Sequence, residues 1–188
     1  MIAVRSYLPS LLTFPGVILR QGIHASVCRV LGVKVLDIRY FRADTPSAYV
    51  LHEMPRSLSK GLTIAFAPLL IHSLLCVLIC IPALVPFKFY DSKIDPVALF
   101  QIWLGISIGV HAFPPFRDTG NLWELTRQEV LSHGAMAWLA FPILAFFRVA
   151  QRLSLFGFDV AYALLIGIAI PWWLLDRAFP IISTIYSY

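Results

Sequence analysis

The chain has 188 residues, of which 59% are hydrophobic and 13% charged, and its mean hydropathy is +0.79. This apolar content excludes an ordinary soluble enzyme and predicts a single integral membrane domain over residues 1–188. The formal charge of +5 is spread over the polar segments. This spread excludes a nucleic-acid-binding protein, which needs one basic patch, and suits contact with the lipid bilayer.

Five apolar segments are long enough to cross a bilayer as helices. They cover roughly residues 8–32, 60–87, 97–115, 134–150 and 156–179. The fourth is short and is expected to pair with the fifth as a C-terminal helical hairpin over residues 134–179. The first continues to Gly32 without a small-residue cleavage site, so we expect a retained helix and not a signal peptide. Gly32 is well placed to end that helix.

Two polar stretches interrupt the helical pattern. In residues 33–56, two strand-like runs flank a turn at 43–47, which predicts a small β-hairpin outside the hydrocarbon core. In residues 117–133, Asn121 is followed three residues later by Glu124, which predicts a helix start at Asn121. The expected fold is therefore an all-α polytopic membrane protein with about five transmembrane helices and a small β-hairpin between the first two.

The distribution of Lys and Arg predicts the orientation of the chain. With five crossings, the larger number of these residues falls on the side of the hairpin and the C-terminus. Cytoplasmic segments carry the excess of positive charge in membrane proteins. The hairpin 33–56 and the C-terminus are therefore predicted to be cytoplasmic.

Arg20, Gln21 and His24 lie near the centre of the first apolar segment. Ionisable groups are costly there, so they indicate a functional site. Arg20 and His24 share one helix face. The pentad 20–24 has the layout of the zinc-protease motif H-E-x-x-H, with Arg20 for the first His and Gln21 for the Glu. A third zinc ligand, often Asp, must come from elsewhere, and Asp118 is the candidate.

With residues 14–19 before it and residues 25–35 after it, the pentad resembles the first catalytic helix of site-2-protease-like membrane zinc metallopeptidases. In that family the H-E-x-x-H helix runs into a Gly-Val-x-Val strand, which is Gly32-Val33-Lys34-Val35 here. Residues 65–70 resemble the start of the family's next core helix, and residues 111–122 resemble the segment that presents the Asp ligand. The similarity covers about residues 10–125 and implies a metallopeptidase-like core over about residues 8–125.

This resemblance implies a degenerate site. His24 takes the place of the second zinc His, and Asp118 that of the Asp ligand. Arg20 cannot ligate zinc, because arginine stays protonated in proteins, and Gln21 cannot act as a general base. We therefore expect an inactive member of the family without metal or cofactor. Arg20 is expected to replace the metal as the local cation and to pair with Asp118, with Gln21 and His24 completing the hydrogen bonds.

The function implied by the resemblance is that of a scaffold or accessory subunit. An inactive protease keeps the groove that bound membrane segments, and such a groove can hold a transmembrane helix of another subunit in a membrane complex. Two alternatives stay open. One is an active intramembrane zinc protease with a rearranged site of His24, Asp118 and, as a further candidate ligand, His111. The other is a transporter component with Arg20 as an anion site, although the sequence shows no internal repeat.

The cysteines and small residues are expected to serve packing. Cys28, Cys76 and Cys80 all fall in apolar segments, which favours packing residues over a disulfide or a zinc cluster. Small residues at near-helical spacing predict close approach of another helix, from this chain or from another subunit. These residues are Gly105, Ser107 and Gly109.

His52 and Glu53 begin like a second H-E-x-x-H motif. Arg56 stands where the second His is needed, and Pro55 ends any helix there. The sequence therefore gives His52 no metal-binding motif of its own.

Overall fold

The computed structural model describes residues 10–42, 47–89, 95–114, 116–131 and 135–185; within these ranges, the side chains of residues 116–118, 121, 131, 135, 136, 139 and 178–185 are not described. The described chain is mostly helical. Its helices are α2 (Phe14–Val30), α3 (Leu58–Phe89), α4 (Pro96–Val110), α5 (Phe116–Leu131), α6 (Ala135–Ser154), α7 (Phe158–Leu164), the π-helical turn η1 (Leu165–Ala169) and α8 (Ile170–Ile185). Strands β1 (Val35–Arg39) and β2 (Tyr49–His52) form an antiparallel hairpin between α2 and α3, which confirms that prediction.

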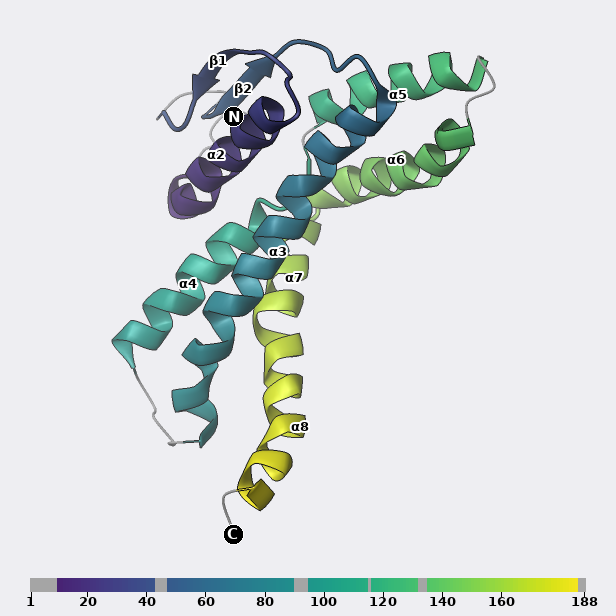
Figure 1. The fold of residues 1–188 in the computed structure, drawn as a ribbon. Coiled ribbons are helices and arrows are strands. Elements are labelled where there is room, and N and C mark those ends of the chain that lie inside the picture. The colour runs from purple at the N-terminus through teal and green to yellow at the C-terminus, as the bar shows by residue number, and fades with distance from the viewer. Residues whose placement is uncertain (1–9, 43–46, 90–94, 115, 132–134, 186–188) are drawn as a thin grey trace.

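The long helix α3 organises the molecule. Figure 1 shows α4 and α7–η1–α8 beside its C-terminal half, and the hairpin, α2, α5 and α6 around its N-terminal end. At the far end of α3, Lys88 forms an ion pair with Asp176 of α8 and lies 4.2 Å from the centre of the Trp172 ring. The end of α8 therefore lies opposite the hairpin. The expectation that the hairpin and the C-terminus share one side of the membrane does not fit this arrangement.

Two of the described helical segments are long and apolar enough to cross a membrane. They are Leu58–Phe89, with 32 residues and a hydropathy of 2.6, and Phe158–Arg177, with 20 residues and a hydropathy of 1.8. The prediction of five such helices is wrong. The first and third apolar segments form regular helices of only 17 and 15 residues. The fourth, α6, carries Arg148, Gln151 and Arg152 towards its C-terminal end, and it packs mainly against α5.

The start of α5 also differs from expectation. The helix begins at Phe116, so Asn121 lies inside it and does not cap it. The non-helical connection after α4 is short, because α4 ends at Val110 and the non-helical residues run up to Pro114. Helix α5 therefore starts at Phe116, five residues before the position that the capping pattern predicted.

Helix α2 ends in a Schellman motif at the predicted glycine. Gly32 has a φ of 69°, a conformation that favours glycine. Its N–H donates to the carbonyl of Arg29 at 3.0 Å, and the N–H of Val33 donates to the carbonyl of Cys28 at 2.8 Å. Lys60 of α3 donates from Nζ to the carbonyl of Leu31 at 2.8 Å. The carbonyls of Cys28, Arg29 and Leu31 are thereby paired, and the chain is directed into β1.

The hairpin returns its second strand to the end of α2. His52 pairs with Val35, and Tyr49 pairs with Arg39, with an irregularity between Val35 and Asp37. The Tyr49 hydroxyl donates to Asp37 Oδ2 at 2.6 Å, and this hydrogen bond raises the pKa of Tyr49. The N–H of Glu53 donates to the carbonyl of Lys34 at 2.9 Å. Because of this register, His52 is placed beside the last turns of α2.

Small residues allow the helices to approach closely. A Cβ on Gly16 of α2 would lie 2.0 Å from the Ser107 carbonyl oxygen of α4, and the Gly16 N–H donates to Ser107 Oγ at 3.2 Å. A Cβ on Gly105 would lie 2.4 Å from Cys80 Sγ of α3. A Cβ on Gly109 would lie 3.0 Å from Cys76 Sγ of α3 and 3.0 Å from the Ala163 Cβ of α7, a tight but milder contact. The small-residue face of α4 thus packs within this chain, and Cys76 and Cys80 are buried packing residues, as predicted.

Substitution Gly16→Ala tests the α2–α4 crossing. The added methyl group meets backbone that cannot rotate away, so we expect a loss of about 1–3 kcal/mol of stability from overpacking. Thermal unfolding in detergent micelles measures it. Gly22→Ala is the matched control on the same helix, because nothing lies within 4 Å of its Cβ position. It is expected to be neutral or stabilising by up to about 1 kcal/mol, and equal losses in the two variants would contradict the crossing.

Candidate functional site

Arg20 connects α2 to the end of α4. Its guanidinium donates from Nη1 to the carbonyl of His111 at 3.1 Å and to the carbonyl of Phe113. Both carbonyls follow the last turn of α4, where helix carbonyls lack intrahelical partners and the helix dipole favours a cation. The residue in the place of the first zinc His therefore has a structural role in the described molecule.

The His111 side chain makes a second connection between the same two helices. Its Nε2 lies 2.7 Å from Thr13 Oγ1, at the start of α2. Arg20 thus contacts the backbone of His111, while Thr13 contacts its ring. The Asp118 side chain lies outside the described residues. The Arg20–Asp118 pair and the ligand set of His24, His111 and Asp118 therefore remain predictions.

A polar cavity of about 180 Å³ lies at this junction. Gln151 of α6 donates from Nε2 to the carbonyl of Pro114 at 2.7 Å, and the Ser154 hydroxyl donates to the Asp159 carboxylate. Arg20 and Asp159 both line the cavity, so it carries a cation and an acidic side chain together. This balance disfavours the reading of Arg20 as an anion site. The lining residues are Arg20, Val110, His111, Phe113, Pro114, Gln151, Ser154 and Asp159.

The zinc set implied by the resemblance does not fit these residues. Arg20 is a hydrogen-bond donor to two carbonyls and has no lone pair for a metal. Gln21 is buried beside it and has no acid–base chemistry at neutral pH. No hydrolytic step by the family mechanism can be derived from this pentad.

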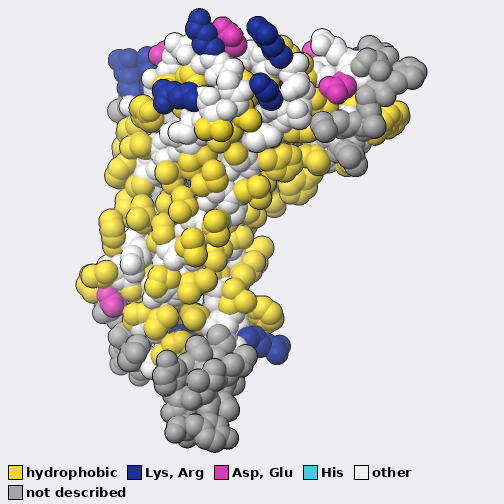
Figure 2. Space-filling view, viewed as in Figure 1, with side chains coloured by type: hydrophobic (Ala, Val, Ile, Leu, Met, Phe, Trp, Pro, Cys, Tyr) yellow, Lys and Arg dark blue, Asp and Glu magenta, His cyan; other side chains and the backbone are white. Residues whose placement is uncertain are grey.

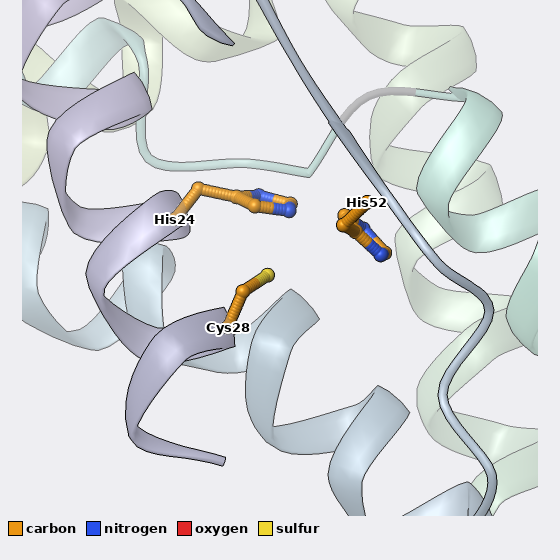
Figure 3. A group of neighbouring side chains, drawn as sticks. All are labelled: His24, Cys28 and His52. Carbon is orange, nitrogen blue, oxygen red and sulfur yellow. The ribbon is translucent and has the colours of Figure 1, made fainter. Parts of the chain in front are cut away.

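A different group of donors lies one helical turn further along α2. Figure 3 shows His24 and Cys28 on adjacent turns of the helix, with His52 approaching from β2. One potential ligand atom from each residue lies within 4.8 Å of the other two. The ring centres of His24 and His52 are 5.2 Å apart. His24 and Cys28 are buried, and His52 is partly exposed.

The sequence reasoning included His24 but missed Cys28 and His52. His24 and Cys28 are four residues apart on one helix, a spacing that is compatible with a shared metal ion. The apolar surroundings of Cys28 favoured a packing role instead. His52 gave no local signal. The register of the hairpin and the Schellman turn bring His52 to α2. Neither feature can be predicted from the spacing of potential ligands along the sequence.

Comparisons with family models, curated proteins and solved structures found no match to this chain. The resemblance to site-2-protease-like metallopeptidases therefore rests on the pentad 20–24 and on residues 32–35, 65–70 and 111–122.

Substitution Arg20→Ala tests the structural role of the guanidinium. We expect a loss of about 1.5–3 kcal/mol of stability, because the variant loses charge-assisted hydrogen bonds to the end of α4. Thermal unfolding in detergent micelles is the measurement, and Arg29→Ala, at an exposed position of the same helix, is the control. A double-mutant cycle with Asp118→Asn measures the predicted pair. Unfolding of Arg20→Ala at the wild-type temperature would contradict the role of Arg20.

Proposed function

We propose that this chain is a catalytically inactive, metallopeptidase-like integral membrane protein. It acts as a scaffold or accessory subunit that binds a transmembrane helix of another subunit. The observation that carries the proposal is the engagement of Arg20 by the carbonyls of His111 and Phe113. The position of the first zinc ligand serves to join two helices, and the neighbouring Gln21 cannot replace the catalytic Glu.

The surface of the molecule supports residence in a membrane. Figure 2 shows apolar side chains over the middle of the molecule and basic side chains gathered at the hairpin end. Exposed cations at that end include Lys34, Arg42, Arg56 and Lys60. We place the hairpin in the cytoplasm, since an excess of Lys and Arg marks cytoplasmic segments. The end of α8 then faces the opposite side, and α2 and α4 enter the bilayer beside the two longer helices.

An open apolar groove on α3 is the surface that we assign to the partner helix. It is lined by Leu62, Thr63, Phe66, Ala67 and Leu70 and has a volume of about 390 Å³. Thr63 and Ala67 are small residues four apart on one helix face. Such spacing favours close packing of transmembrane helices, because hydrophobicity alone does not drive association in lipid.

Co-purification in a mild detergent tests the scaffold. We expect the native protein to retain a membrane protein in stoichiometric amount, and Ala67→Leu to lose it because the larger side chain fills the groove. Leu78→Phe, at an exposed position of the same helix (56% exposed) outside the groove, is the control and is expected to retain the partner.

The enzyme alternative is measured on the same preparation. Cleavage of membrane peptides by the purified protein, abolished in His24→Asn, would favour the rearranged protease. Retention of no membrane protein by the wild type would contradict the scaffold.

A further inference from the structure

We propose that His24, Cys28 and His52 form a binding site for one divalent metal ion of borderline softness, with Zn²⁺ as the preferred ion. This site is independent of the proposed scaffold function. It is also distinct from the ligand set of the metallopeptidases, because it uses residues 24 and 28 of α2 in place of positions 20 and 24.

The donor types and spacing suit zinc. Imidazole nitrogen and thiolate sulfur are its preferred protein ligands, at about 2.0–2.3 Å from the metal. Ligands in a tetrahedral site then lie about 3.3–3.8 Å apart. The three donors here are all within 4.8 Å of one another. Binding an ion would therefore bring these donors closer together by up to about 1.5 Å.

The hydrogen bond made by His52 prepares its ring for a metal. His52 Nδ1 lies 2.7 Å from the backbone carbonyl of Glu53. A carbonyl can only accept, so Nδ1 carries the proton and Nε2 keeps a free lone pair. Metal-binding histidines typically donate their other ring N–H in this way, which fixes the tautomer and orients the ring.

The surroundings shelter two of the donors. Cys28 has no exposed surface and His24 is 4% exposed, so bulk water is excluded from both. His52 is partly exposed, and it also borders a small apolar cavity of about 20 Å³ that His24 and Cys28 do not line. Three protein ligands and a water would complete four-coordinate zinc.

The helix end adds an electrostatic contribution. Cys28 lies in the last turn of α2, where the helix dipole favours positive charge. Its thiolate would offset one of the two charges of the ion. A bound ion would connect the last turn of α2 to β2, which already contact each other through the rings of His24 and His52.

Metal titration of the full chain in detergent tests the site. The first protein carries Cys76→Ser and Cys80→Ser, so Cys28 is its only thiol. We expect one Zn²⁺ per chain by metal analysis. With Co²⁺ as the probe, we expect tetrahedral absorption bands and a thiolate charge-transfer band, both removed by added Zn²⁺. Because this protein keeps all three ligands, the measurement does not depend on a ligand variant that fails to fold.

Ligand variants are then compared with matched controls. Cys28→Ser and His52→Asn are expected to weaken Zn²⁺ binding by at least about tenfold, and Cys28→Ser also removes the charge-transfer band. Cys76→Ser alone is expected to bind Zn²⁺ as the wild type does.

Three results would overturn the site. They are the absence of stoichiometric Zn²⁺ in the wild type, wild-type affinity in both ligand variants, and loss of binding in His111→Asn with retention in His52→Asn. The last would support the set of His24, His111 and Asp118 instead. Co-purification of the partner subunit is measured separately, so failure of the metal site and failure of the scaffold are distinguishable.

Discussion

The close crossing of α2 and α4 positions Arg20 and His111 at the candidate functional site. Gly16 permits backbone contact with Ser107, and a side chain there would collide with the Ser107 carbonyl. Arg20 and Thr13 then reach the end of α4, where Arg20 donates to the carbonyls of His111 and Phe113. A partly buried guanidinium needs such acceptors, because unpaired buried charge is costly. The crossing therefore explains the tolerance of Arg20.

Helix α2 contacts different elements along its length. Its first half contacts α4, and Arg20 joins the two helices. Its second half, with His24 and Cys28, is directed to the hairpin and His52. If the chain descends from a zinc protease, the charge of the lost metal has been replaced at one end by arginine. At the other end the donor types for a metal are still gathered, one turn away from the family position.

The proposed membrane arrangement depends on unequal helix lengths. α3 and the α7–η1–α8 segment are long enough to cross a bilayer, whereas α2 and α4 are shorter and meet near the middle of α3. Arg20 of α2 and the C-terminal end of α4 line a cavity shared with Gln151, Ser154 and Asp159. In the proposed membrane arrangement, non-helical backbone at this depth is tolerated where it is buried in protein and hydrogen-bonded. Gln151 meets this requirement for Pro114, and Arg20 meets it for Phe113.

The sequence by itself determined the helical class, the hairpin, the end of α2 at Gly32 and the packing role of the α4 glycines. Each of these depends on local backbone preference or on residue size at a fixed helical spacing. It also identified Arg20 and His24 as unusual, because charge in an apolar segment needs a partner.

Only the tertiary structure decided what these residues contact. The partners of Arg20 are backbone carbonyls, which have no sequence signature, and the donors beside His24 depend on a strand register and a helix-ending turn. The third apolar segment gives a helix of only 15 residues, because the chain leaves the helical conformation after Val110. The hydropathy of the sequence did not indicate this end.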